Sequence, residues 1–283
     1  MPELPEVQTV VSQLDQKITG KVISLTWSDW QKKILTPFKQ FSKTIKGARV
    51  LGVRRIGKHI IIDLDNDHSI VAHLKMTGHF LVKDETNRLS KAFTEDSING
   101  YIHHIITFAD GMTLEFSDMR KFGWLRLMKT AEVEESASIT SLGIDALSRK
   151  LTPPVFQTIL IKRKTRPVGV VLLEQNLIAG IGNIYRSEAL YLAGVLPDRR
   201  IGTLTQSEWA RILPAIKKVL RHAVRLHGTS DGDFRDTDGL RGRFKRVLYV
   251  YGRTGEPCKK CGTIIERKKL GSRSIFFCSW CQK

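Results

Sequence analysis

Four cysteines restrict the fold of this 283-residue chain more than any other feature of its sequence. They form two Cys-x-x-Cys pairs, Cys258/Cys261 and Cys278/Cys281, with 16 residues between the pairs. That spacing is typical of a tetrahedral zinc site. Two disulfide bonds are the alternative, but nothing in the sequence marks the chain as secreted. Four thiolates would complete the zinc shell, so we expect one structural Zn²⁺ with no open position for a substrate.

The residues between the two cysteine pairs predict a β-hairpin, with strands at 263–265 and 275–277 and a turn at 270–272. Positive charge gathers in the same part of the chain. The sequence has 46 Lys and Arg against 28 Asp and Glu, a net charge of +18, and residues 241–283 contribute +10 of it (12 basic minus 2 acidic residues). A solvated basic tail is the alternative interpretation. Because the segment also contains all four cysteines, we expect a folded basic module that binds a polyanion.

The rest of the chain is long enough for further domains. Its hydrophobic fraction of 41% excludes a disordered polyelectrolyte, and no apolar run approaches the 18 residues that a membrane span needs. Up to about residue 130, short β-rich runs between turn signals predict a β-sandwich. These runs are residues 60–64, 69–74 and 113–116.

Helical patterns lie on both sides of these strands. Apolar residues at i, i+3, i+4 and i+7 predict a helix over residues 5–14. The last predicted helix opens with a capping box from Thr205 to Glu208 and contains Pro214. The helices expected after the linker are 153–160, 172–177, 184–192 and 205–226. We therefore expect a multi-domain α+β fold made of an N-terminal β-sandwich with a helix at its start (1–135), a linker (136–152), a helical domain (153–240) and a β-hairpin zinc finger (241–283).

The first residues of the chain offer chemistry of a different kind. Removal of Met1 would leave Pro2 as a secondary amine, which can attack an electrophilic carbon and form an iminium ion. A free α-amino group titrates near pH ~8, so a useful fraction is neutral, and the positive end of the predicted helix would favour that form. Glu3 is placed to act as a general acid or base. Taken alone, a Pro-Glu start is more often just the entry to a helix.

Six segments add to this interpretation and together span essentially the whole chain. They are MPELPEV (1–7), GK (57–58), HLKMTG (73–78), DMRKFG (118–123), GIGNIY (180–185) and CSWCQ (278–282). In this order and at this spacing, the chain resembles the bacterial formamidopyrimidine-DNA glycosylases of the Fpg/Nei family of base-excision repair enzymes. The resemblance implies that the helical domain contains a helix–two-turn–helix motif and that the polyanion is duplex DNA.

The resemblance also implies catalytic roles for four residues. Pro2 would displace the damaged base from C1′, and Glu3 would protonate the sugar oxygen. Lys58 matches the family's lysine for β-elimination, and Arg273 its hairpin arginine, assigned to the second elimination. Because an arginine hardly deprotonates, we expect Arg273 to act chiefly as a phosphate clamp.

The family displaces the damaged base from the stack and fills the gap with three side chains, which Met76, Arg120 and Phe122 match. Without the resemblance, Met76 and Phe122 would be interpreted as core residues. Asn183 and Lys164 match residues that contact phosphates, and Tyr101 stands where the family has a histidine that contacts DNA. The expected DNA contacts are therefore Met76, Tyr101, Arg120, Phe122, Lys164 and Asn183.

Three further features concern phosphate contacts and the choice of substrate. Gly169 stands where the family usually has a lysine, so a phosphate contact is either absent or supplied by Arg166. Residues 186–188 (Arg-Ser-Glu) are similar to the endonuclease VIII branch, which prefers oxidised pyrimidines, whereas the first residues and the 118–123 segment favour the purine branch. The segment 229–240, rich in Gly, Asp and Thr, is expected to form a mobile loop over the lesion.

We therefore expect a bifunctional DNA glycosylase/AP lyase that excises oxidised purines (8-oxoguanine, formamidopyrimidines) through a proline iminium with β,δ-elimination. The alternatives are an endonuclease VIII-like enzyme for oxidised pyrimidines and a non-catalytic zinc protein that binds damaged DNA. The expected partner is duplex DNA that contains oxidised bases or abasic sites. We further expect a monomer that does not bind membranes, with a cytoplasmic, nucleoid-associated location in a bacterium.

Overall fold

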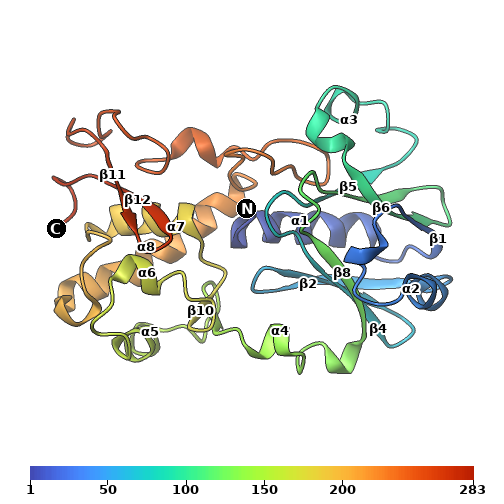
Figure 1. Ribbon diagram of the computed structural model, residues 1–283, viewed down its shortest axis with the longest axis horizontal. Coiled ribbons are helices and arrows are strands. Elements are labelled where there is room, and N and C mark those ends of the chain that lie inside the picture. The colour runs from blue at the N-terminus through green and yellow to red at the C-terminus, as the bar shows by residue number, and fades with distance from the viewer. The chain divides into compact units, whose positions relative to one another are not determined.

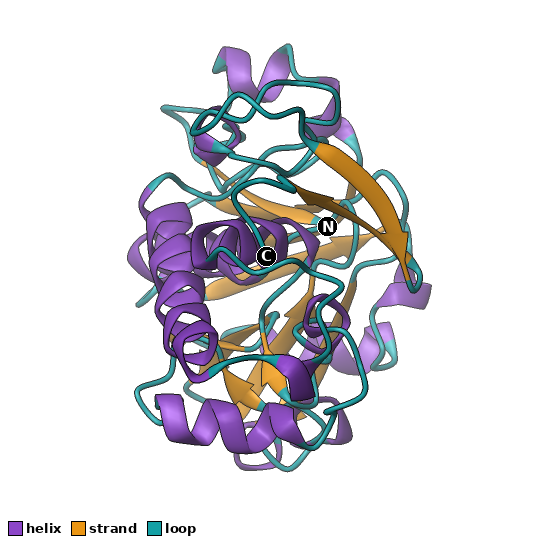
Figure 2. Cartoon of the chain, turned by 90° about the vertical axis from the view of Figure 1, so that its left-hand side faces the viewer, coloured by secondary structure: helices purple, strands orange, loops and turns teal.

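The computed structural model describes residues 1–283 and divides into two compact units. The first unit comprises residues 1–140 and 226–245, and the second comprises 141–225 and 246–283. Residues 226–240, which were expected in the helical domain, thus pack within the first unit. Figure 2 shows the distribution of helices, strands and loops. None of the helices combines the length and apolar character that crossing a bilayer requires.

The first unit is built on two four-stranded antiparallel sheets, so the predicted β-sandwich is confirmed. One sheet has the order β1-β6-β7-β5 and the other β2-β3-β4-β8. The three predicted strands correspond to β3, β4 and β7. The bounds are β1 Ile23–Ser28, β2 Val50–Ile56, β3 His59–Leu64, β4 His68–His73, β5 His79–Lys83, β6 Ile102–Phe108, β7 Thr113–Ser117 and β8 Trp124–Lys129.

Helix α1 (Leu4–Ile18) lies between the two sheets (Figure 1). Its apolar stripe belongs to one continuous core with side chains from both sheets, among them Ile60 of β3 and Phe80 of β5. The predicted stripe is fully buried and extends one turn beyond the predicted end, to Ile18, because that residue also packs into the core. This burial fixes the position of the residues that precede the helix.

Shorter elements complete the first unit. Helix α2 (Phe38–Ile45) packs against the first sheet and was not predicted, because its two buried residues, Phe41 and Ile45, give too short a pattern. Between β5 and β6 the chain makes an excursion, residues 84–100, that contains α3 (Lys91–Thr94) and the 3-10 turn η2 (Ser97–Gly100). The remaining short elements are η1 (Gln31–Lys33), η3 (Thr130–Glu132), η5 (Phe244–Val247) and α4 (Ala137–Thr140).

The second unit is mainly helical. Helix α8 opens with the predicted capping box, since the Thr205 N–H donates to Glu208 Oε2 (2.7 Å) and the Glu208 N–H to Thr205 Oγ1 (3.3 Å). Pro214 lies inside α8, as expected. The bounds are β9 Ile144–Asp145, α5 Pro153–Ile161, α6 Val168–Val171, β10 Ile178–Ala179, α7 Asn183–Ala193, η4 Ile201–Thr203, α8 Gln206–Arg225, β11 Glu266–Leu270 and β12 Arg273–Phe277.

Two predicted elements of this unit were wrong. The leucines of 172–177 do not form a helix: α6 ends at Val171, and the N–H groups of Leu173 and Glu174 bond three residues back in tight turns. The first strand of the finger hairpin begins at Glu266 rather than 263, because residues 256–265 pair with one another around the first cysteine knuckle. The hairpin itself and its turn at Gly271 are confirmed.

Candidate active site and DNA interface

The first turn of α1 holds the N-terminal residues in a fixed, buried geometry. Pro2 is buried, and Glu3 is only 3% exposed. Glu3 is the N-cap of the helix and forms a reciprocal capping box with Glu6, whose Oε2 accepts the Glu3 N–H at 2.8 Å. The positive end of a 15-residue helix therefore points at the residues before Leu4, where it stabilises negative charge and a neutral amine.

The turn that carries Lys58 lies beside this end of α1. Strand β2 runs alongside the helix. The Val53 N–H donates to Asp15 Oδ1 (2.8 Å), and the Arg55 Nε–H donates to Gln8 Oε1 (2.9 Å), which lies nearer the start of α1. Arg55 also holds the turn by donating to the Gly57 carbonyl at 2.8 Å. Lys58 itself is 8% exposed, so its ammonium group is largely withdrawn from water.

Two histidines that adjoin Lys58 stay uncharged at neutral pH. His59 of β3 and His73 of β4 are cross-strand neighbours with ring centroids 4.9 Å apart, and Trp124 of β8 continues the row. Burial lowers the pKa of His59 to about 4, against a raising effect of its bond to the Ile56 backbone. Burial chiefly, and then repulsion from His59 when it is protonated and from Lys75 and Lys58, lower the pKa of His73 to about 3.

Hydrogen bonds through two buried side chains connect the loops that carry Met76, Arg120 and Phe122. Thr77, in the 74–78 loop, donates its hydroxyl to Asp118 Oδ1 in the 118–123 loop, and the two side chains are 3% and 1% exposed. Asp118 also accepts from the N–H groups of Arg120 (3.2 Å) and Gly123 (2.7 Å). The two loops thus form one rigid surface.

The same loops show backbone strain and close packing. Lys75 and Lys121, each immediately before a proposed gap-filling residue, have φ of 54° and 56° in the left-handed region, which side chains other than glycine rarely adopt. A methyl group on Gly123 would lie 2.5 Å from Phe116 Cζ. Glycine is therefore required where this loop crosses the sheet, and the strain indicates a shape kept by its surroundings.

Three of the four DNA-contact side chains expected on this unit are exposed. Phe122 is 46% and Tyr101 41% exposed, so both aromatic side chains are accessible to a ligand. The Arg120 guanidinium, also exposed, lies 4.8 Å from the Phe122 ring centroid. Met76 is half-buried. The Tyr101 carbonyl accepts the Asp118 N–H at 2.8 Å, so Tyr101 adjoins the 118–123 loop.

In the second unit, Asn183 is the first residue of α7, after a glycine turn that the Gln175 side chain holds by bonds to the Gly180 N–H (3.0 Å) and the Ile181 carbonyl (2.8 Å). This places Asn183 at the positive end of an 11-residue helix, a geometry suited to phosphate. Lys164 is exposed just after α5.

Arg186 is a residue for which the sequence analysis gave no structural role. Its side chain is fully buried and donates to Asn183 Oδ1 (2.5 Å), the Gly169 carbonyl (2.8 Å) and the Ser274 carbonyl (3.0 Å). It thereby joins Asn183 to the finger hairpin next to Arg273. The close packing also explains the glycine at 169, since a Cβ there would lie 2.7 Å from the Pro197 carbonyl oxygen.

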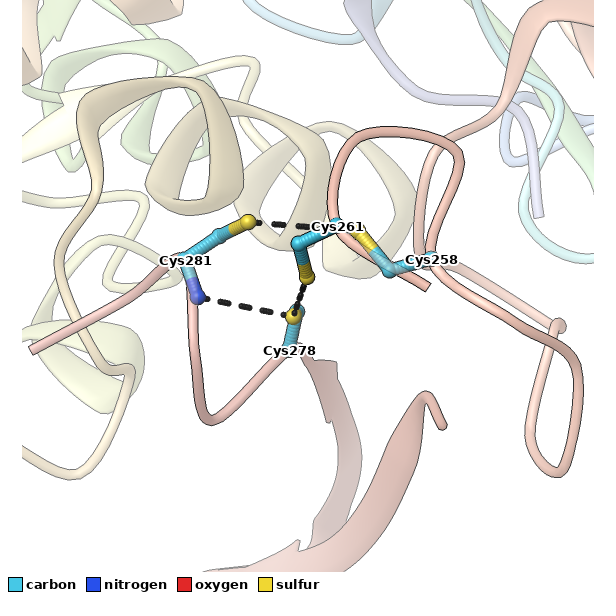
Figure 3. A group of neighbouring side chains, drawn as sticks. All are labelled: Cys258, Cys261, Cys278 and Cys281. Atoms are coloured by element: carbon cyan, nitrogen blue, oxygen red, sulfur yellow. Dashed lines mark hydrogen bonds between the residues drawn. The ribbon is translucent and has the colours of Figure 1, made fainter. Parts of the chain in front are cut away.

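The four cysteines converge from the two knuckles at the base of the hairpin β11–β12 (Figure 3). Their sulfur atoms all lie within 4.8 Å of one another, with Cys258–Cys281 at 3.9 Å and Cys261–Cys278 at 3.5 Å. A tetrahedral ion with 2.3 Å bonds requires roughly 3.8 Å between sulfurs. No disulfide is present. The cluster therefore fits one structural zinc ion.

Tyr191 adds a contact to this cluster that the cysteine spacing could not reveal. Its hydroxyl lies 3.3 Å from Cys258 Sγ, and its ring stacks on Tyr249 with centroids 5.2 Å apart. Burial raises the pKa of the Cys258 thiol, but the Tyr191 hydroxyl and nearby backbone N–H groups outweigh it and lower that pKa to about 6. Thiolate, the form that binds zinc, is thus favoured at this position.

The zinc cluster fixes a hairpin whose outer surface is cationic. The residues of β11 are almost all exposed, and Arg273, the first residue of β12, is exposed at the turn and forms no ion pair. Lys268 lies above the Phe277 ring, with its Nζ 5.0 Å from the centroid. The exposed cations of the hairpin are Arg267, Lys268, Lys269 and Arg273.

Together these features define a zinc-finger protein in which a β-sandwich, a glycine-turn helix and a basic hairpin offer surfaces for a polyanion. Family models match three segments: the formamidopyrimidine-DNA glycosylase N-terminal domain (1–125), the formamidopyrimidine-DNA glycosylase H2TH domain (142–234) and the zinc finger found in FPG and IleRS (255–283). The chain belongs to the formamidopyrimidine-DNA glycosylase family.

Curated relatives and solved structures agree with this assignment. The formamidopyrimidine-DNA glycosylases of Pelotomaculum thermopropionicum and Listeria monocytogenes are each 37% identical to the chain, over 100% of it and 99–100% of their own lengths. The Lactococcus lactis Fpg, solved in complex with DNA that contains an abasic site, superposes with a TM-score of 0.87 at 31% identity, covering 99% of both chains. The same protein has been solved with DNA that contains an N7-benzyl-Fapy-dG.

Proposed function

We propose that the protein is a bifunctional DNA glycosylase/AP lyase that removes oxidised purines from duplex DNA, with Pro2 as its nucleophile. The observation that carries the proposal is the buried first turn of α1, where Pro2 and Glu3 stand at the positive end of the helix beside the Lys58 turn. Family membership supports the glycosylase activity, and the chemistry of a secondary amine supports the lyase activity.

The reaction begins when Met1 has been removed and the Pro2 nitrogen is free. Its lone pair attacks C1′ of the damaged nucleotide, and the bond to the base breaks with its electron pair leaving on the base. The nitrogen, now bonded to C1′, loses its own proton to water. Its lone pair then forms the C=N bond while the bond between C1′ and the ring oxygen breaks, and Glu3 protonates that oxygen, so that the sugar opens and an iminium ion joins Pro2 to C1′. The helix end stabilises the anionic carboxylate of Glu3 afterwards.

The iminium ion makes the C2′ hydrogen acidic. Removal of that proton expels the 3′ phosphate, and a second elimination expels the 5′ phosphate. Lys58 is proposed to serve the first elimination, because it is only 8% exposed, lies beside the N-terminal turn and matches the family's lysine for this step. Arg273 is proposed to bind a phosphate through its guanidinium group, which hardly deprotonates.

A base inside the stack cannot reach an amine on the protein, so it must leave the duplex. We assign the filling of the resulting gap to Met76 and Phe122 as apolar wedges and to Arg120 as a donor to the orphaned base. The exposure of Phe122 and the rigid Thr77–Asp118 link between the loops support this role. Wedges on a preformed surface lose little conformational entropy on binding.

Further DNA contacts are assigned to the second unit and to Tyr101. Asn183 is proposed to bind a phosphate at the start of α7, with its amide oriented by Arg186, and Lys164 to bind another. Tyr101, which replaces a histidine of the family, retains a hydroxyl that can donate to a phosphate oxygen.

Oxidised pyrimidines are the second candidate substrates, since the Lactococcus lactis Fpg has also been solved with DNA that contains an oxidized pyrimidine. The test compares single-turnover base release from duplexes that contain 8-oxoguanine opposite cytosine or thymine glycol opposite adenine. Faster release of 8-oxoguanine supports the proposal. Faster release of thymine glycol would assign the chain to pyrimidine repair, and release of neither would contradict both.

A further inference from the structure

The 228–240 loop is joined directly to the N-terminal turn. Glu6 Oε1 accepts the Thr229 N–H at 2.6 Å while its Oε2 accepts the Glu3 N–H, so one carboxylate connects the two segments. Gly228 packs so closely that a Cβ would lie 2.6 Å from Glu6 Oε1. The loop therefore leaves from the place where Pro2 and Glu3 are held.

The far end of the loop is held by the excursion between β5 and β6, residues 84–100. Arg235 donates from Nε to Asp96 Oδ2 at 2.7 Å, and Asn99 donates from Nδ2 to the Gly239 carbonyl at 3.2 Å. The ring of Phe93 packs on Gly239, where a Cβ would lie 3.0 Å away. At the edge of the sheet, the Val82 N–H donates to the Thr237 carbonyl at 2.9 Å.

These contacts bury a charged side chain, Arg235, in the 228–240 loop, although the composition of this loop predicted that it would be mobile. Arg235 is 1% exposed, and its guanidinium also donates to the carbonyls of Gly232 and Phe234. Phe234 belongs to the main core. A buried guanidinium needs its carboxylate partner, because an unpaired charge there would be costly. Between these anchored halves the tip, residues 231–233, is open to solvent.

Asp96 is well placed to act as this partner. Its second carboxylate oxygen caps η2 by accepting the Ile98 N–H at 3.2 Å. The position of the carboxylate is therefore held within the excursion itself, independently of the 228–240 loop. Burial raises the pKa of Asp96, but the bonds from Arg235 and Ile98 outweigh it and keep that pKa below its ordinary range. The pair is therefore ionised at neutral pH.

We propose that the 84–100 excursion braces the 228–240 loop, which is already expected to lie over the lesion, in an ordered conformation before DNA binds, with Asp96 and Arg235 as its positioning pair. The inference rests on the proposed glycosylase function and adds to it a determinant of base recognition. An abasic site presents no base to the loop. Loss of the brace should thus slow base release and leave strand cleavage at abasic sites unchanged.

The test compares Asp96→Ala with Asp84→Ala. Asp84 is a carboxylate of the same excursion whose side chain bonds only within its own turn, to Thr86 and Asn87. Hydrogen exchange of peptides from 229–240 in the free protein should become about tenfold faster or more in Asp96→Ala, as expected for the loss of a charge-assisted bond. It should stay at the wild-type rate in Asp84→Ala.

Kinetics complete the test. Single-turnover release of the damaged base should slow about tenfold in Asp96→Ala, with cleavage of a preformed abasic duplex within about twofold of wild type. Equal losses on both substrates, or fast exchange with unchanged base release, would overturn the inference. If Asp96→Ala unfolds, Asp96→Asn is measured in the same way. Failure of the proposed function is distinct, since the wild-type protein itself would then release no base.

Discussion

Replacing His59 with phenylalanine should flatten the dependence of stability on pH. His59 is 7% exposed, lies in a row with His73 and Trp124 across three strands, and has a pKa lowered to about 4. The unfolded chain binds a proton at an ordinary histidine pKa of about 6.5, whereas the folded chain resists it. Stability from this group is therefore complete above pH 6.5 and is lost as pH falls toward 4.

The size of the effect follows from that shift. Between pH 7 and pH 5, a histidine whose pKa falls from about 6.5 to about 4 on folding removes about 2 kcal/mol from the free energy of unfolding. Phenylalanine does not titrate and fills a similar volume. The difference between the wild-type protein and His59→Phe should therefore shrink by about 2 kcal/mol over that range, and by more if His73 also becomes easier to protonate.

The assay is urea unfolding of both proteins at pH 7 and pH 5, followed by tryptophan fluorescence. Trp124→Phe is the matched control, because it changes the same aromatic row and leaves both histidines in place; its pH slope should follow the wild type. Equal slopes for His59→Phe and the wild-type protein would refute the argument that burial holds this histidine neutral beside Lys58.

Three further predictions concern the loops and the finger. Gly123→Ala should lower the free energy of unfolding by ~1–3 kcal/mol, since its methyl group would overlap the buried ring of Phe116; an unchanged urea midpoint would contradict the packing. Cys278→Ala should lose zinc, measured by metal analysis, and with it DNA affinity, measured by fluorescence anisotropy; zinc loss with affinity retained would show that the finger does not bind DNA. Tyr191→Phe should release zinc to a chelator ~10-fold faster, because the hydroxyl no longer bonds to Cys258; an equal rate would remove that role.

Features that depend on a fixed spacing of nearby residues could be predicted from the sequence. The four-cysteine cluster, the capping box at Thr205 and the buried stripe of α1 depend on fixed spacings, and the structure has all three. The predicted helix at 172–177 failed for the opposite reason. Its leucines are spaced for a helix, but only Leu172 is buried, and the backbone after Val171 closes three-residue turns instead of continuing the helix.

The parts of the site that the sequence did not predict depend on contacts between segments far apart in the chain. Asp118 lies 41 positions from Thr77, and Arg235 lies 139 positions from Asp96, so no local pattern pairs them. The segment 229–240 was expected to be mobile from its composition, yet its charged and apolar side chains are anchored in the first unit. Two signals were present in the sequence: the Glu-x-x-Glu spacing at Glu3, and the short polar residues Thr77 and Asp118 within the 73–78 and 118–123 segments.

The central claim is that Pro2 is the nucleophile, and borohydride trapping tests it most directly. The protein, with removal of Met1 checked by mass spectrometry, is incubated with an abasic duplex and borohydride, and the covalent product is digested and sequenced. An adduct is expected on the peptide that begins with Pro2, and none is expected for Pro2→Gly. An adduct on Lys58 instead, or no adduct from protein whose N-terminus is Pro2, would contradict that claim.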